Sequence, residues 1–174
     1  MKRIRSLLIT AFLALPVHAQ TTAWRPYESA QGRFKVSFPG TPVVNYGKVR
    51  TEIGDVLSAR HSASDGTEIT YDVTYNDYPK EGIAKLSAAK LVDTVRDGLV
   101  YQAKGKLVAE KPHSVGKIAG RELEIEGGDG MRYRIRLMLV ANRLYQLTAM
   151  ARPPAQADDK EFFGSFELTG GVPR

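Results

Sequence analysis

Apolar and polar residues alternate along much of the chain, which is the pattern of strands that are buried on one face. The clearest alternation lies in the stretch EITYDVTYNDYP, residues 68–79, where Ile69, Tyr71, Val73 and Tyr75 are separated by polar residues. Strands are predicted at residues 33–38, 48–53, 56–63, 67–76, 106–111, 117–126, 131–140 and 143–151. Turn residues such as Asp-Gly between them favour hairpins, so the chain is predicted to form an antiparallel sheet.

Two segments show the spacing of three and four residues that is typical of an amphipathic helix. In the first, apolar residues recur from Ile83 to Ala103, and Gly105 supplies a stop. The second is predicted at residues 155–166, and its acidic first turn suits the positive end of the helix dipole. Residues 21–31 are expected to form an irregular lead-in. The predicted fold class is therefore α+β, an antiparallel β-sheet flanked by helices.

The tyrosines of the alternating stretch have two interpretations. A period of two places Tyr71 and Tyr75 on one face of a strand, and the simpler reading is that this face packs beneath the long helix that follows. Tyr78 comes just after the strand and is the more exposed candidate for the rim of a pocket. Core packing is the preferred interpretation. The alternative is a small-ligand carrier with an aromatic pocket at Tyr71, Tyr75 and Tyr78.

The N-terminus has the organisation of a secretory signal peptide. A basic start at residues 1–5 precedes an apolar run at 6–17, and small residues at Val17 and Ala19 suit cleavage after Ala19. The apolar run is about a dozen residues, whereas a spanning helix needs about 20. We therefore expect residues 1–19 to be removed, leaving a single domain at residues 20–174 that is periplasmic or secreted.

Charge and cysteine content exclude several functions. The formal charge is +6, but three of the 25 basic residues lie in the leader, so 22 basic and 19 acidic residues leave the mature chain at only +3. No run of lysine or arginine points to nucleic acid. The chain contains no cysteine, which excludes thiol catalysis and cysteine-ligated metals.

The sharpest charge pattern lies on both sides of the glycine-rich turn at residues 127–130. Alternate positions hold three glutamates before the turn and three arginines after it: Glu122, Glu124, Glu126, Arg132, Arg134 and Arg136. In an antiparallel hairpin they would face one another, and each opposed pair contributes about 0.2–1 kcal/mol. An arginine stripe for an anionic ligand is the functional alternative, but the glutamates would repel an anion. We therefore predict a self-neutralising Glu/Arg ladder on a solvated face.

No catalytic, metal-binding or cofactor-binding set is expected. Ser87 and Lys90 match the S-x-x-K motif of penicillin-interacting enzymes, but the other motifs of those enzymes are missing from the sequence. His61 is expected to be a partly buried sheet residue, and His113 a solvated turn residue after Pro112. A hydrolase whose site assembles in space remains an alternative, with Ser87 and His61 as its members.

Three segments carry a resemblance to a known family. They are WRPYESAQGRFKVSFPGTP at residues 24–42, YDVTYNDYP at residues 71–79 and FFGSFEL at residues 162–168. Together with the long helix and the order of the strands, they resemble small exported bacterial proteins of the PsbP-like fold family, over nearly the whole mature chain.

The resemblance implies a PsbP-like α/β/α sandwich, with a central antiparallel sheet between helices. Known members act as binding or assembly partners rather than as enzymes and offer no catalytic residues to carry over. The leading hypothesis is an exported, non-enzymatic binding or assembly module whose partner is a protein or an envelope component. No cofactor, no nucleic acid partner and no transmembrane segment in the mature chain are expected.

Overall fold

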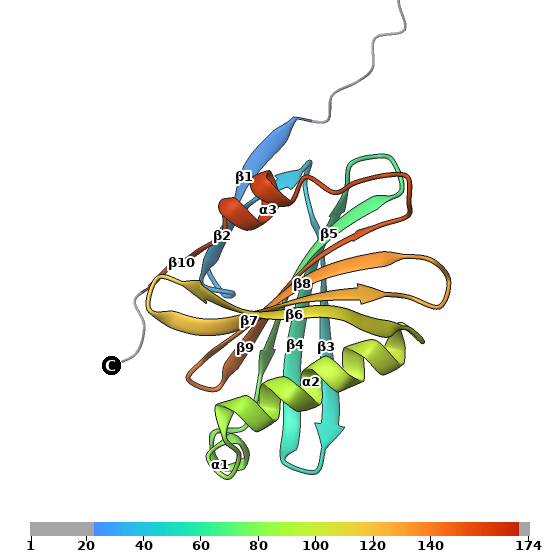
Figure 1. Ribbon diagram of the computed structural model, residues 1–174. Helices are drawn as coiled ribbons and strands as arrows, with labels where there is room; N and C mark the ends of the chain where they lie inside the picture. The colour runs from blue at the N-terminus through green and yellow to red at the C-terminus, as the bar shows by residue number, and fades with distance from the viewer. Residues whose placement is uncertain (1–22, 171–174) are drawn as a thin grey trace, which may run out of the picture.

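The computed structural model describes residues 23–170 (Figure 1). The predicted signal peptide at residues 1–19 lies outside the described residues. Within them, no helix is both long enough and apolar enough to cross a membrane.

The frame of the molecule is a seven-stranded antiparallel sheet with the strand order β3-β4-β5-β9-β8-β7-β6. Its strands are β3 (Val43–Thr51), β4 (Gly54–Ser64), β5 (Ile69–Asp77), β6 (Lys106–Val115), β7 (Ile118–Glu126), β8 (Arg132–Val140) and β9 (Arg143–Ala151). The two halves of the chain meet where β5 pairs with β9, with Tyr75 opposite Tyr145. The predicted antiparallel sheet is confirmed.

The two faces of this sheet bury different sets of side chains. On β5, Tyr71 and Val73 belong to one core cluster with Phe34 and Phe162. On β8, Ile135 belongs to a second cluster with residues of the long helix. Successive side chains of a strand point to opposite faces, so β8 and β9 contribute residues to both clusters, whereas β5 contributes to the first alone.

A helix covers one face and a smaller sheet covers much of the other. Helix α2 (Ala88–Gln102) runs across the large sheet, away from α3 (Asp159–Gly164) and the small sheet (Figure 1). The small sheet has the order β1-β2-β10 and consists of β1 (Trp24–Ser29), β2 (Phe34–Pro39) and β10 (Glu167–Leu168). The α+β class is therefore confirmed, but the second face is covered largely by strands rather than by a helix alone.

Several element boundaries differ from the predictions, and β3 begins at Val43 rather than at residue 48. The irregular lead-in is in fact strand β1, because its residues pair with β2, Tyr27 lying opposite Val36. Strand β6 continues through Pro112 to Val115, since an edge strand tolerates a missing N–H. Residues 52 and 53 form the turn between β3 and β4 in place of the predicted Gly54-Asp55, because Thr51 lies opposite Gly54.

The long helix begins later than its apolar spacing predicts. Residues Lys80–Ile83 form a separate single turn, α1, and α2 starts after Ser87, whose Oγ accepts a hydrogen bond from the backbone N–H of Lys90. A serine N-cap satisfies one of the free N–H groups at a helix start. At the other end, Gly105 is required, because a Cβ there would lie 2.1 Å from the carbonyl oxygen of Glu126.

Candidate functional site

Tyr71 and Tyr75 are core residues on the face that the small sheet covers. The ring of Tyr71 meets Trp24 edge-on with centroids 4.9 Å apart, and its hydroxyl accepts a hydrogen bond from the backbone N–H of Asp158 at 2.8 Å. Tyr75 stacks under the guanidinium of Arg143, 4.3 Å from the ring centroid. The expectation that these tyrosines lie beneath the long helix is wrong, because α2 packs on the opposite face.

Tyr78 is separated from the other two tyrosines. It packs against the cluster beneath α2, and burial raises the pKa of its hydroxyl. Its backbone N–H and C=O both bond to Asn142, at 2.9 and 2.7 Å. Three hollows in the described surface are lined by other residues. The aromatic pocket therefore stays a prediction that this arrangement does not favour.

The two members of the alternative hydrolase site lie on opposite sides of the large sheet. His61 is buried against the small sheet, where its Nδ1 bonds to the hydroxyl of Tyr27 at 3.0 Å and burial lowers its pKa. Ser87 lies on the other face, where its hydroxyl caps α2. His113 is a half-buried residue of β6 rather than a solvated turn residue, and burial lowers its pKa. The geometry brings none of them together.

The Glu/Arg ladder has the predicted register. Glu122 lies opposite Arg136, Glu124 opposite Arg134 and Glu126 opposite Arg132. Charge is neutralised locally, with 2.9 Å between Arg134 Nη2 and Glu124 Oε1. The solvated end of the ladder lines an open hollow of about 510 Å³ beside residues 155–157. Because both signs of charge line it, this hollow selects no simple ion.

One end of the ladder is buried, which corrects the expectation of a solvated face. Glu122 is buried and accepts from Arg136 at 2.7 Å and from Lys111 at 2.9 Å. Burial alone would raise the pKa of this carboxyl, but the hydrogen bonds from Lys111 and Arg136 lower it overall. Arg136 also stacks on Phe163, 4.5 Å from its ring centroid. This end of the ladder therefore fastens α3 to the sheet.

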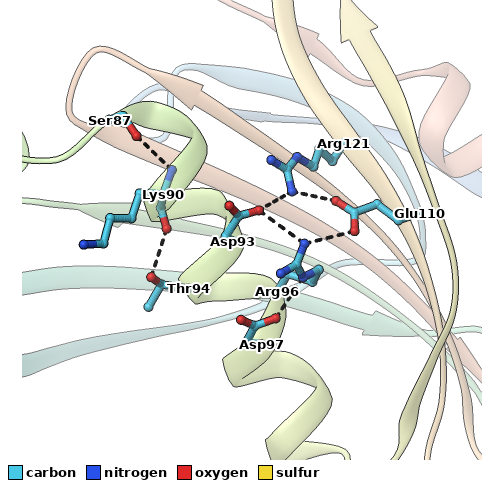
Figure 2. A network of polar contacts seen from close by, with 8 residues as sticks. All are labelled: Ser87, Lys90, Asp93, Thr94, Arg96, Asp97, Glu110 and Arg121. Atoms are coloured by element: carbon cyan, nitrogen blue, oxygen red, sulfur yellow. Dashed lines mark hydrogen bonds and ion pairs between the residues drawn. The ribbon is translucent and has the colours of Figure 1, made fainter.

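A second charge network holds α2 against β6 and β7 (Figure 2). Arg121 Nη1 donates to Asp93 at 2.5 Å and to Glu110 at 2.6 Å. Arg96 contacts the same two carboxylates at 3.2 and 3.1 Å and adds Asp97 at 2.8 Å. Each arginine is thus shared between carboxylates of different elements. The network is structural, and the sequence does not reveal it because Asp93, Glu110 and Arg121 are far apart in the chain.

The two edges of the large sheet differ in how they meet solvent. At the β6 edge, a register shift between Leu107 and Ala109, a proline at position 112 and flanking lysines interrupt the outer strand. Bulges, proline and lysine are the usual means by which proteins prevent further strands from adding to an edge. The ladder of strand β3 has neither a register shift nor a proline, since all nine residues from Val43 to Thr51 pair with β4, although this strand also carries Lys48 and Arg50.

The uninterrupted edge also carries exposed apolar side chains. Val43, Tyr46 and Val49 on β3 and Leu57 on β4 are large apolar residues that remain exposed in the described structure. We call the outer side of β3, with these four residues, the β3 edge. Tyr46 and Leu57 share one face of the sheet and Val43 and Val49 the other, as the pairing with β4 requires. The β3 edge is the candidate functional site.

Comparison with known proteins supports the fold but no specific role or partner. No protein-family model and no curated protein matches the chain. Among solved structures, cyanobacterial PsbP from Synechocystis sp. PCC 6803 superposes with a TM-score of 0.53 and 10% identity, over 90% of this chain and 98% of that one. A protein of unknown function from Pseudomonas aeruginosa reaches a TM-score of 0.34 and 14% identity over 75% of this chain and 83% of its own, too low to support an argument. The chain has a PsbP-like fold, as its sequence predicts.

Proposed function

We propose that the protein is an exported, non-enzymatic binding module whose β3 edge takes up an extended segment of a partner protein. The observation that carries this proposal is the asymmetry of the sheet: a register shift and Pro112 interrupt the β6 ladder, whereas the β3 ladder is continuous and carries exposed Val43, Tyr46 and Val49. In β-strand addition, the backbone of an edge strand supplies hydrogen bonds and pockets for alternate side chains supply specificity. Strand β3 meets the first requirement through its outer backbone edge, and its exposed Val43, Tyr46 and Val49 offer apolar contacts to the side chains of an added strand.

The side chains of the β3 edge define the chemistry of the partner segment. Exposed apolar groups lie on both faces, so the partner strand would place apolar side chains beside Tyr46 on one face and beside Val43 and Val49 on the other. Lys48 and Arg50 follow Tyr46 on the same face. The partner segment is therefore expected to combine alternating apolar residues with an acidic residue beside Arg50, because Lys48 Nζ already lies 2.8 Å from Asp55 Oδ2.

Site-specific crosslinking tests the proposal with a matched control at the other edge. A photoreactive phenylalanine analogue replaces Tyr46 in the full chain expressed in its own host, and a second chain carries it at Val108 on β6. We expect a crosslinked adduct with another protein from position 46 and not from position 108, because β6 resists strand addition.

Two aspartate substitutions then separate edge binding from loss of folding. Val49 is 58% exposed on β3 and Val108 is 56% exposed on β6, so Val49→Asp and Val108→Asp are closely matched changes. Val49→Asp should reduce the adduct by about tenfold, and Val108→Asp should leave it unchanged, with native circular dichroism for both. Equal reductions, no adduct, or an adduct made only of two copies of this chain would refute a partner strand on β3.

The absence of catalysis has a test of its own. Purified mature protein should show no turnover of ester, amide or glycan substrates. Turnover that a single substitution abolishes, at Ser87 or elsewhere, would overturn the claim that the protein is not an enzyme. It would not affect the crosslinking result.

A further inference from the structure

The face of the large sheet that carries α2 is only partly covered. The cluster beneath α2 draws its buried residues from β7, β8 and the start of β9. On the same face, the neighbouring strands present polar side chains, at Ser58, Arg60, Ser62, Asp72, Thr74 and Gln146. Where the helix ends and this polar area begins, there is a cleft of about 290 Å³. We call it the Asp72 cleft.

Asp72 is the unusual residue of the cleft. It lies on β5 in the middle of the sheet and is only 4% exposed. Its Oδ2 accepts from Arg60 Nη2 at 2.5 Å, while its Oδ1 is buried without a hydrogen-bond partner in the described part of the chain. A buried carboxylate oxygen without a donor is costly for the folded state, and such a group calls for a specific explanation. A donor supplied by a ligand would provide one.

The rest of the cleft offers a polar floor and an apolar wall. Gln146 Nε2 donates to Thr148 Oγ1 at 3.1 Å, which leaves the carbonyl oxygen of the amide as an acceptor. Leu99 and Met150 line the cleft beside these polar groups. The C-terminal end of α2, which forms part of the wall, has no basic residue in its last turn. The negative end of a helix dipole favours a cation placed there.

The charges of the cleft favour a ligand that carries both signs. Arg60 is half exposed, so its guanidinium has N–H groups that remain accessible while one bonds to Asp72. An isolated cation would be attracted by Asp72 but repelled by Arg60. An isolated anion would be attracted by Arg60 but repelled by Asp72. The cleft of about 290 Å³ lies just below the range of about 300–1,000 Å³ for small-molecule pockets, which restricts the ligand to the size of a small metabolite.

We propose that the Asp72 cleft binds a small zwitterion with an apolar side chain, as in an aliphatic α-amino acid. The carboxylate of Asp72 turns to present Oδ1 to the ammonium group, the ligand's carboxylate accepts from Arg60, and the apolar side chain lies against Leu99 and Met150. This site is on a face of the sheet, away from the outer side of β3, so it does not depend on the strand-addition proposal.

Binding of three related probes tests the assignment of both charges. The probes are L-leucine, 3-methylbutylamine, which lacks the carboxylate, and 4-methylpentanoate, which lacks the ammonium group. Each is titrated into the folded mature protein to about 10 mM, which detects dissociation constants near 1 mM. We expect L-leucine to shift the NMR signals of the Gln146 amide and the Met150 methyl group, and each analogue to bind at least about tenfold more weakly.

Three variants distinguish the site from general surface binding. Asp72→Asn and Arg60→Gln should each weaken L-leucine by about tenfold or more, and Arg134→Gln on the opposite face should leave it unchanged. The double variant Arg60→Gln/Asp72→Asn removes both charges together and leaves no buried charge unpaired. It therefore gives a folded protein for the same titration even where a single variant does not fold.

The result that overturns the proposal is equally specific. No shift with L-leucine, shifts confined to residues outside the cleft, or undiminished binding by the double variant would each exclude the site. Binding of 3-methylbutylamine as tight as that of L-leucine would exclude a zwitterion as the ligand.

Discussion

The two ends of the Glu/Arg ladder should respond very differently to the same substitution. Arg134 and Glu124 have side chains that are 39% and 41% exposed, whereas Arg136 and Glu122 are 21% and 5% exposed. Arg134→Ala and Arg136→Ala therefore remove the same kind of pair from one strand, and the pairs differ in burial and in the added contacts of Glu122 with Lys111 and of Arg136 with Phe163. The comparison tests whether burial, rather than the sequence pattern, decides what each pair contributes to stability.

The expected magnitudes follow from the contacts. Exposed ion pairs contribute about 0.2–1 kcal/mol, so Arg134→Ala should cost less than about 1 kcal/mol. Removing one partner of a buried pair costs about 3–5 kcal/mol, but Lys111 stays 2.9 Å from Glu122 and reduces this cost. Lost stacking of Arg136 on Phe163 adds about 0.5–1 kcal/mol. We expect about 2–4 kcal/mol for Arg136→Ala.

Urea denaturation of the purified mature protein measures both values. With a slope of about 2 kcal/mol/M, in the middle of the usual range for small proteins, Arg136→Ala should lower the urea midpoint by about 1–2 M and Arg134→Ala by less than about 0.5 M. The slope itself should not change, because neither substitution alters the surface that unfolding exposes. Equal midpoints for the two variants would show that the reasoning from burial is wrong.

Acid provides an independent check on the same carboxylate. Because the pKa of Glu122 is lower in the folded protein than its usual value, its contribution to stability is present above the unfolded pKa, near 4.3. That contribution is lost as the pH falls through the folded pKa. Glu122→Gln should remove this part of the acid dependence, and Glu124→Gln should leave it. A pH dependence that neither variant changes would contradict the assignment.

Other substitutions test single contacts of the core and the helix start. Ser87→Ala should cost about 1 kcal/mol through loss of the α2 cap, and Ser87→Asp should not; equal losses in thermal melts would argue against capping. Burial lowers the pKa of His61, so the free energy of unfolding should decline as the pH falls below about 6.5. In His61→Gln, the urea midpoint should therefore change less between about pH 7.5 and 5.5. The same pH dependence of the midpoint in both proteins would contradict the burial of His61. Tyr71→Phe should cost about 1 kcal/mol because the backbone N–H of Asp158 loses its acceptor, whereas Tyr101→Phe, on an exposed ring, should leave the melting temperature unchanged; similar losses in both would refute this.

Local patterns predicted the elements whose pairing partners are close in the chain. The hairpin of β7 and β8 and its charge register depend on a short turn and a period of two, so Glu122 and Arg136 could be paired from the sequence. Strand β1 could not be predicted in this way, because its residues become a strand by pairing with β2. The start of α2 was misplaced for a related reason, since apolar spacing continues through residues where Ser87 in fact caps the helix.

Neither of the two proposed binding regions could be predicted from the sequence, because each depends on relations between distant segments. Whether β3 is an edge follows from the order of strands in the sheet, and no residue of β3 encodes that order. The Asp72 cleft combines β4, β5 and β9 with the end of α2. From the sequence, Asp72 is only one of several polar residues on the outer face of an alternating strand.

The sequence by itself determined the class of the fold, the alternating faces of its strands and the absence of thiol chemistry, because these depend on composition and on periodicity within single segments. The tertiary structure decided which layer each face meets. Tyr71 and Tyr75 point toward the face predicted to be buried, but a small sheet and α3 cover it instead of α2. Such choices depend on contacts between segments distant in the chain, and periodicity within one segment carries no information about them.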